Sequence, residues 1–296
     1  MTDARRVWWN GAIVGADEAR VSVLDTGFLY GDGVYDTMRS YGGRVFAIDR
    51  HLERLARSAQ RVDLRLPERA TLRRAIEEAV AANGGGDHAV RITVTRGRLA
   101  KRLDLSTAGP ASVLVATDPI EPFEDERRRG GIRVVWSRFV RLSAHPLAGV
   151  KSTNYQVSLF ARNEAREAGA QEVLLANESG AIVEGAASNV FLVEGRRLVT
   201  PPLTTGILGG ITREVVLELA REKSLPVEES ALPRERIEAA SEVFMTGTTI
   251  QVAPVVEIAG RPVGAGRPGP SSLELLDGYV AAVAKDVATP RPIPAA

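Results

Sequence analysis

The sequence contains no cysteine and only three histidines. Without cysteine, the chain can form neither disulfides nor thiolate metal sites. The histidines, His51, His88 and His145, are far apart in sequence and show no metal-ligand spacing, so we expect no metal site. The chain also lacks an apolar run long enough to span a bilayer, and its N-terminus lacks a signal-peptide pattern. These absences predict a cytoplasmic protein without a membrane partner.

An excess of charge of either sign is absent as well. The chain has 38 basic and 37 acidic residues, which give a net charge of +1. This balance supplies no electrostatic reason to expect nucleic-acid binding. Apolar residues make up 44% and charged residues 25% of the 296 positions, as is usual for a globular protein. A chain of this length suffices for one large or two medium domains.

Lysine is scarce among the basic residues. Only four positions carry it, namely Lys101, Lys151, Lys223 and Lys285. An arginine side chain stays protonated, whereas an amine can lose its proton and attack a carbonyl. Lys151 lies in residues 149–155, Gly-Val-Lys-Ser-Thr-Asn-Tyr, between a strand-like run and a helix-like run. Two interpretations remain open at this point, a lysine that forms a Schiff base and a solvated surface lysine.

Local patterns predict several elements. Asn10-Gly11 between two short apolar runs predicts a hairpin. Residues 89–95 are predicted to form a strand and residues 50–62 a helix, with Asp49 as its N-cap.

The order of strand-like and helix-like segments predicts an α+β fold, because the two kinds mix without strict βαβ alternation. Two prolines, a charge run and a glycine pair make residues 118–131 the expected linker. We therefore expect an N-terminal domain over 1–117 and a C-terminal domain over 132–287 that carries Lys151. The remaining residues, 288–296, contain three prolines and are predicted to be a disordered tail.

A Schiff-base cofactor such as pyridoxal phosphate needs an amine, an anion site for its phosphate and a carboxylate near its pyridine nitrogen. Residues 209–212, Gly-Gly-Ile-Thr, precede a predicted helix whose N-terminal N–H groups could bind the phosphate. Glu184 leaves an apolar strand beside small residues, where a flat ring could lie. The alternatives are an ordinary glycine-rich helix start and a surface glutamate. Tyr155, four residues after Lys151, is either a partner of the ring hydroxyl or a core tyrosine.

Six segments occur in an order that resembles a known family. They are residues 30–35 (Tyr-Gly-Asp-Gly-Val-Tyr), 51–55 (His-Leu-Glu-Arg-Leu), 151–155 (Lys-Ser-Thr-Asn-Tyr), 184–191 (Glu-Gly through Ser-Asn-Val-Phe), 210–213 (Gly-Ile-Thr-Arg) and 244–248 (Phe-Met-Thr-Gly-Thr). Together they resemble the fold-type IV pyridoxal-phosphate enzymes, also called class IV aminotransferases. This family includes branched-chain and D-amino acid aminotransferases and aminodeoxychorismate lyases. The resemblance implies the two-domain α+β fold of the D-amino acid aminotransferases, pyridoxal 5'-phosphate (PLP) as cofactor, and a homodimer or higher homo-oligomer.

The resemblance also implies roles for individual residues. Lys151 would hold the cofactor and shuttle a proton, and Glu184 would pair with the pyridine nitrogen. Tyr155 would contact the ring hydroxyl, and Leu208 would pack against the ring. The phosphate would be bound by Arg54, Gly210, Ile211, Thr212, Gly247 and Thr248.

The substrate face is expected on the strand over 34–41. Tyr35, Thr37 and Arg39 share one side of this strand and should face the substrate, whereas Val34, Asp36 and Met38 share the other side. D-amino acid aminotransferases hold the substrate carboxylate with an arginine and a histidine in the loop after residues 96–97. Here that loop has no histidine, which leaves Arg98, Lys101 or Arg102 as candidates. Branched-chain enzymes usually have glycine in the place of Thr37, and Thr37 resembles the lyases.

We expect transamination between an amino acid, either a D-amino acid or a branched-chain L-amino acid, and a 2-oxo acid such as 2-oxoglutarate or pyruvate. The alternative is 4-amino-4-deoxychorismate lyase activity.

Overall fold

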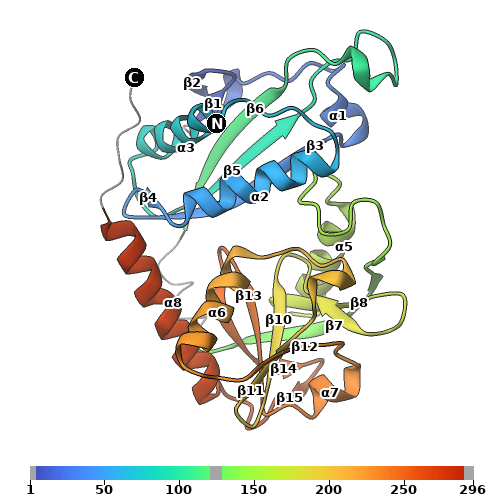
Figure 1. Cartoon of the computed structure of the whole chain (residues 1–296), viewed down its shortest axis with the longest axis vertical. Coiled ribbons are helices and arrows are strands. Elements are labelled where there is room, and N and C mark those ends of the chain that lie inside the picture. Colours follow the sequence, from blue (N-terminus) through green and yellow to red (C-terminus); the bar gives the residue numbers. More distant parts are fainter. Residues whose placement is uncertain (1–4, 121–128, 290–296) are drawn as a thin grey trace. The chain divides into compact units, whose positions relative to one another are not determined.

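The structure is a computed structural model that describes residues 5–120 and 129–289. The chain divides into two compact units (Figure 1). The described part of the first unit comprises residues 5–120, 150–154 and 285–289, and the second comprises 129–149 and 155–284. The stretch that holds Lys151, expected in the C-terminal domain, is thus grouped with the first unit. The expected linker at 118–131 and the tail at 288–296 lie mostly outside the described residues, so the domain boundaries stay predictions.

A six-stranded antiparallel sheet forms the centre of the first unit, with the strand order β2-β1-β6-β5-β3-β4. Its strands are β1 (Arg6–Trp9), β2 (Ala12–Gly15), β3 (Gly33–Tyr41), β4 (Arg44–Val45), β5 (His88–Thr95) and β6 (Ser112–Pro119). Its helices are α1 (Thr26–Tyr30), α2 (Ile48–Arg61) and α3 (Arg69–Ala82). The hairpin predicted at Asn10-Gly11 is confirmed, and both residues have the positive φ that a tight hairpin turn requires.

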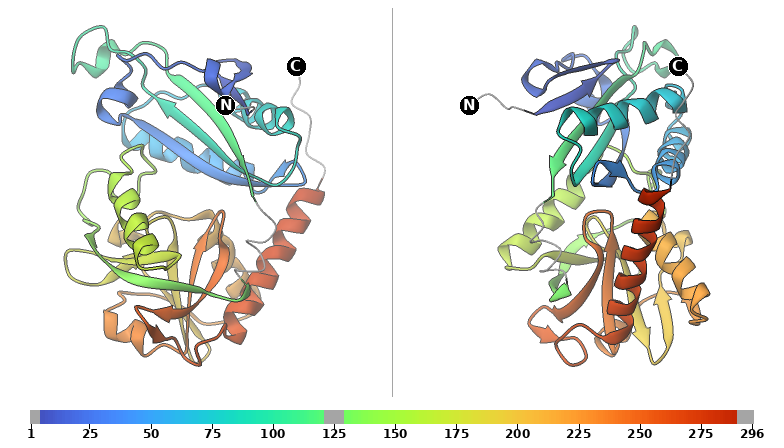
Figure 2. Two further views of the ribbon diagram at one scale, coloured as in Figure 1. Left: turned by 180° about the vertical axis from the view of Figure 1, so that it is seen from behind. Right: turned by 90° about the vertical axis from the view of Figure 1, so that its left-hand side faces the viewer.

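Helices α2 and α3 cover one face of this sheet, as the two views in Figure 2 show. Alternate residues of β3, including Val34 and Met38, point to that side and are fully buried. They form one apolar core with Leu55 of α2 and Ile76 of α3. Because strand residues alternate between faces, the intervening residues of β3 lie on the opposite face of the sheet, which α2 and α3 leave open.

The second unit is built on a nine-stranded mixed sheet. Its strands are β7 (Ile132–Val140), β8 (Glu172–Ala176), β9 (Ile182–Glu184), β10 (Asn189–Glu194), β11 (Arg197–Thr200), β12 (Val227–Glu229), β13 (Glu242–Gly247), β14 (Gln251–Ile258) and β15 (Arg261–Pro262). Strand β9 pairs with both β8 and β10, so β10, β13, β14, β7, β8 and β9 close into a ring around an apolar core. The helices are α5 (Gln156–Glu167), α6 (Ile211–Glu222), α7 (Arg234–Glu238) and α8 (Pro270–Ala288).

None of the helices formed by residues 5–120 and 129–289 has the length and apolar character needed to cross a bilayer. Over the same residues, no group of three histidine, aspartate or glutamate side chains is arranged to hold a metal ion.

Candidate active site

Lys151 lies on a short extended stretch beside the start of β3. Its carbonyl oxygen accepts a hydrogen bond from the Tyr35 N–H (2.9 Å), and the Thr153 N–H donates to the Gly33 oxygen (2.9 Å). The Lys151 N–H donates to the hydroxyl of Ser58 on α2 (3.2 Å). The backbone of the lysine is therefore held by both β3 and α2. Its Nζ atom lies 4.7 Å from the centroid of the Tyr35 ring, within the range of a cation–π contact.

The open face of the first sheet brings together three predicted substrate residues. The pairing of β3 with β5 places Tyr35 opposite Thr93, Thr37 opposite Arg91, and Arg39 opposite Ala89. Residues paired in this way share one face of the sheet. The Lys151 amine lies beside the same face, because it contacts the Tyr35 ring.

Arg91 is a basic residue on this face that sequence reasoning missed. Its guanidinium lies 3.6 Å from the centroid of the Tyr35 ring, and its Nε donates to the Thr93 hydroxyl (3.3 Å). Arg39, in contrast, is buried, lies over the Tyr41 ring and forms an ion pair with Asp87 (3.4 Å). The signal for Arg91 was the alternation of residues along the predicted strand 89–95, which puts it on one side with Thr93.

Arg54 of α2 is buried and paired with Asp36 of β3. Its Nε lies 2.8 Å from Asp36 Oδ2, and its Nη2 lies 2.7 Å from Asp36 Oδ1. The second atom, Oδ1, also lies 2.8 Å from Nδ1 of His51, one turn before Arg54 on the same helix. Asp36 is completely buried. Sequence reasoning placed it with Val34 and Met38 but drew no conclusion from an acidic residue on that apolar face.

The charges of this cluster follow from its contacts. Burial alone would raise the pKa of the Asp36 carboxyl, but the charges and hydrogen bonds of Arg54 and His51 outweigh burial and hold that pKa well below its usual range. Burial lowers the pKa of His51. Asp36 opposes this shift, and the positive charges of Arg54 and Lys151 reinforce it. His51 is therefore neutral at pH 7, and its Nδ1–H donates to Asp36.

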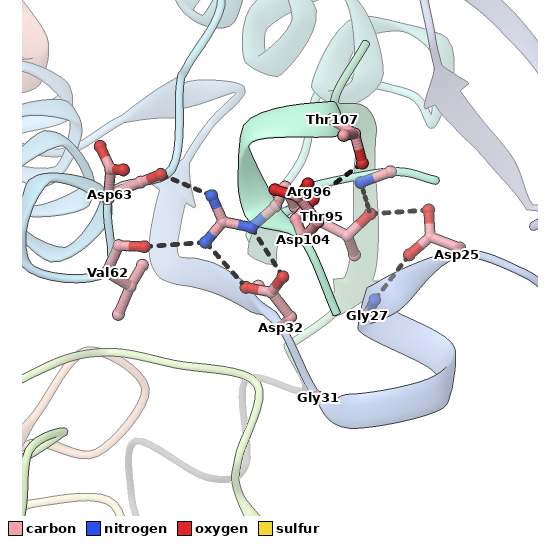
Figure 3. Close-up of polar contacts among 12 residues, drawn as sticks. Asp25, Gly27, Gly31, Asp32, Val62, Asp63, Thr95, Arg96, Asp104 and Thr107 are labelled. Atoms are coloured by element: carbon pink, nitrogen blue, oxygen red, sulfur yellow. Dashed lines mark hydrogen bonds and ion pairs between the residues drawn. The ribbon is translucent and has the colours of Figure 1, made fainter. Parts of the chain in front are cut away.

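Arg96 begins the basic loop after β5, and its side chain has a structural task (Figure 3). Its Nε and Nη2 lie 2.7 Å and 3.1 Å from the two carboxylate oxygens of Asp32. Its guanidinium also donates to the carbonyl oxygens of Val62 and Asp63, just after α2. Arg96 thus ties the start of this loop to the end of the helix that carries Arg54. Two residues further on, the predicted substrate residue Arg98 is exposed.

In the second unit, Glu184 ends β9 with a buried carboxylate. Its Oε1 lies 2.8 Å from Nε of Arg141, and its Oε2 accepts a hydrogen bond from the Leu208 N–H (3.2 Å). Nη2 of Arg141 donates to the Ser158 hydroxyl (3.2 Å). Arg141 and the Leu208 N–H therefore fix the orientation of both carboxylate oxygens. Sequence reasoning missed Arg141, since an arginine in a loop carries no pattern that links it to a distant glutamate.

The start of α6 has the features of an anion site. Gly210 is its N-cap and gives no side-chain cap to the N–H groups that follow. A Cβ atom at this position would lie 2.1 Å from Oδ1 of Asn189, so only glycine fits. The Asn189 amide donates to the Leu208 oxygen (2.9 Å). Uncapped N–H groups and the positive end of the helix dipole favour a phosphate here.

Strand β13 supplies a further polar group beside this helix start. Thr246 pairs with Asn189 across β10 and β13. Its hydroxyl is buried and has no hydrogen-bond partner among the residues that the structure describes. Gly247 ends the strand, and Thr248 follows it, both half-buried. A buried hydroxyl without a partner is costly, so this site fits a ligand that accepts a hydrogen bond.

The other predicted cofactor residues lie on the same two units. Ile211 and Thr212 form the buried first turn of α6, and Tyr155 is the half-buried N-cap of α5. The first unit thus holds the amine of Lys151 and the Arg54 cluster. The second holds a buried carboxylate and an uncapped helix N-terminus. These are the groups that a phosphate-bearing pyridine cofactor requires.

Comparison with known proteins decides the family. The sequence matches the family model described as "Amino-transferase class IV" over residues 33–258. The chain belongs to the class IV aminotransferases. A putative branched-chain-amino-acid aminotransferase of Methanocaldococcus jannaschii is 36% identical, covering 87% of this chain and 89% of that protein. A D-alanine aminotransferase of Bacillus licheniformis is 35% identical, covering 90% and 92%.

Solved structures agree with this assignment. The T.th. branched-chain amino acid aminotransferase with pyridoxamine 5'-phosphate superposes with a TM-score of 0.86 at 33% identity, covering 96% of each chain. The branched-chain aminotransferase of Escherichia coli has a TM-score of 0.88 at 29% identity, covering 95% of each. The predicted family, the fold-type IV α+β fold and the cofactor PLP are confirmed. The chain is a PLP-dependent aminotransferase, and the lyase alternative is not favoured, because the relatives named here are aminotransferases.

Proposed function

We propose that this aminotransferase binds PLP through Lys151 and uses a D-amino acid or a branched-chain L-amino acid as the donor. The acceptor is a 2-oxo acid such as 2-oxoglutarate or pyruvate. The observation that carries the proposal is the placement of the Lys151 amine beside the Tyr35 ring, on the open face that also bears Thr37 and Arg91. An amine at this position can bind the cofactor and can also carry the proton of the substrate α-carbon.

The chemistry divides between the cofactor and the protein. When bound, PLP acts as an electron sink that makes the proton on the substrate α-carbon acidic. Nζ of Lys151 holds the cofactor and then carries that proton. The Glu184 carboxylate keeps the pyridine nitrogen protonated. Nε of Arg141, 2.8 Å from Oε1 of Glu184, holds this carboxylate in place.

The remaining predicted cofactor residues hold the ring and the phosphate. Tyr155 contacts the ring hydroxyl, and Leu208 packs against the ring. The phosphate is bound by Arg54, by Gly210, Ile211 and Thr212 at the start of α6, and by Gly247 and Thr248 after β13. The uncapped N-terminus of α6 supports this assignment, since its N–H groups can each donate to a phosphate oxygen.

The substrate lies on the open face of the first sheet, against Tyr35 and Thr37. Arg91 binds the substrate carboxylate there, supported by its position opposite Thr37 and its contact with the Tyr35 ring. Arg39, on the same side of β3, forms an ion pair with Asp87 and so helps to stabilise this face. Arg98 stays a second candidate for the carboxylate, on the exposed loop after β5.

A second copy of the chain covers an exposed apolar surface of the first unit, giving a homodimer. Residues around α1 and on the loop after β5 expose large apolar side chains, with Val23 at 69%, Phe28 at 70% and Leu103 at 67% exposure. The two segments are neighbours, because the Thr26 N–H donates to the Gly97 oxygen (2.9 Å). Monomers rarely expose such patches. Sedimentation of the Phe28→Ser variant should show weaker association. A cytoplasmic location stays a prediction.

A donor panel tests the proposed function. Purified enzyme with PLP is given D-alanine or L-alanine with 2-oxoglutarate, and L-valine, L-leucine or D-valine with 2-oxoglutarate and with pyruvate. The 2-oxo acid produced from the donor is measured. Transfer from D-alanine or from the branched-chain L-amino acids is expected. Pyruvate release from aminodeoxychorismate without amino transfer from any donor would contradict the proposal.

A further inference from the structure

Glu172, the first residue of β8, is a buried carboxylate to which no role has yet been given. Its side chain is 2% exposed. Its Oε1 accepts hydrogen bonds from the N–H groups of Val173 (3.0 Å) and Ala186 (3.2 Å), and its Oε2 accepts one from the Ser188 hydroxyl (3.0 Å). Arg162 lies 3.6 Å from Oε2. A buried charge is retained only when such partners compensate for its lost hydration.

Two of these donors belong to the turn that joins β9 to β10. This turn, residues 185–188, is closed by a hydrogen bond from the Gly185 N–H to the Ser188 oxygen (2.7 Å). It is also tightly packed, since a Cβ atom on Gly185 would lie 2.3 Å from the Ser188 hydroxyl oxygen. Glu172 therefore binds the turn at its second residue, Ala186, and at its last, Ser188.

The residues on either side of the turn both form hydrogen bonds with the backbone of Leu208. Glu184, before the turn, accepts the Leu208 N–H (3.2 Å), and Asn189, after it, donates to the Leu208 carbonyl oxygen (2.9 Å). Leu208 lies two residues before Gly210, the N-cap of α6. A shift of the turn would therefore move the carboxylate proposed for the pyridine nitrogen and the side chain against the proposed phosphate site together.

We propose that Glu172 is a positioning residue for the cofactor. By holding residues 185–188, it sets the direction of the Glu184 carboxylate and of the Asn189 amide. This inference rests on the proposed function, in which Glu184 and the start of α6 hold PLP. Glu172 acts only through the turn.

The test compares Glu172→Gln with a matched variant, Glu242→Gln, in the full-length chain. Glu242 is likewise buried, and it accepts the N–H groups of Ser271 and Ser272 and the Ser272 hydroxyl, at the start of α8. Apoenzyme is titrated with PLP, and the visible absorption spectrum, unfolding temperature and kcat are recorded. Glu172→Gln should weaken PLP binding about tenfold, the effect of one or two lost hydrogen bonds. It should also shift the absorption band and lower kcat.

Glu242→Gln should lower the unfolding temperature but keep the PLP affinity within about twofold and the spectrum unchanged, because a change in stability alone does not reorient the turn. If Glu172→Gln does not fold, Ser188→Ala removes one donor to the same carboxylate and carries the same expectation. Wild-type affinity and spectrum in the folded Glu172→Gln or Ser188→Ala variant, or equal losses in the Glu242→Gln control, would overturn the inference. A wild-type chain that develops no PLP band would instead overturn the proposed function.

Discussion

Arg54 and Asp36 form a two-point ion pair in the first unit, with Nε 2.8 Å from one carboxylate oxygen and Nη2 2.7 Å from the other. Both side chains are buried. A guanidinium held at two points has a fixed plane, so Asp36 sets the direction in which Arg54 meets a ligand. The proposed phosphate contact of Arg54 therefore depends on Asp36.

The Asp36→Asn variant should lose both stability and cofactor affinity. Removing one partner of a buried pair leaves an uncompensated charge, which costs about 3 kcal/mol or more of unfolding free energy. Without a fixed guanidinium, the dissociation constant of PLP should rise about tenfold. Urea unfolding and a PLP titration of the apoenzyme measure the two effects.

Asp32→Asn is the matched control for this variant. Asp32 forms the same kind of two-point pair with Arg96 in the same unit, but Arg96 serves the loop after β5 (Figure 3). This control should lose stability while its PLP affinity stays within about twofold of the wild type, since Arg96 contacts Asp32, Val62 and Asp63, none of which is assigned to the phosphate. Unchanged PLP affinity in Asp36→Asn would remove Arg54 from the phosphate site.

Acid should destabilise the chain in two steps that follow from the lowered pKa values. The pKa of His51 lies below its ordinary value of 6.5, so the unfolded state binds more protons and stability falls as pH drops below about 6.5. The pKa of Asp36 is also lowered, so its contribution is complete above about 4 and is lost as pH falls further. Neither group changes stability between pH 7 and 8.

The variant His51→Asn separates the two steps. Its amide can donate to Asp36 but does not titrate, so the loss of stability between pH 6.5 and pH 5 should shrink by up to about 1.4 kcal/mol per pH unit. Urea unfolding at pH 7.5, 6 and 5, at one PLP concentration, makes the comparison. Identical pH dependence in the two proteins would show that His51 keeps an ordinary pKa.

Gly210→Ala should damage the phosphate site directly. The added Cβ would lie 2.1 Å from Oδ1 of Asn189, so Asn189 must move and weaken its bond to the Leu208 oxygen. We expect PLP affinity to fall about tenfold and stability to fall by about 1–3 kcal/mol. Gly209→Ala is the control, because its Cβ would meet only a Leu203 methyl group at 3.9 Å. Equal effects of the two substitutions on PLP binding would contradict the assignment.

Arg91→Ala should raise the KM of the amino donor about tenfold or more, because a hydrogen bond to a charged carboxylate contributes about 1.5–3 kcal/mol. The substitution leaves the cofactor contacts in place, so kcat should change little. Initial rates over a range of donor concentrations supply both constants. Arg98→Ala should leave KM near the wild-type value. The reverse pattern would assign the carboxylate to Arg98 instead.

Local patterns in the sequence predicted much of the fold. The Asn10-Gly11 hairpin, the strand over 34–41 and the helix over 50–62 follow from turn chemistry, alternation and 3.6-residue periodicity, and the structure has them at nearly the same bounds. Motif order also predicted the family, which the comparison confirmed. In these cases the signal lies within a few neighbouring residues or in a fixed order of short segments.

Contacts between distant segments were missed. Asp36 with Arg54, Arg141 with Glu184, and Glu172 with Ser188 are each separated by 16 residues or more, and no periodicity links them. The pairing of residues 150–154 with β3 was missed for the same reason. Arg39 was predicted only in part. Its side of β3 was predictable, but its partner Asp87 was not.

Mapping the lysine that carries the cofactor tests the central claim most directly. The PLP-loaded enzyme is reduced with borohydride, which fixes the cofactor to the amine that binds it, and the labelled peptide is identified by mass spectrometry. The chain has four lysines, so each alternative is distinguishable. The account predicts the label on Lys151. A label on Lys101, Lys223 or Lys285, or a protein that retains no label, would contradict it.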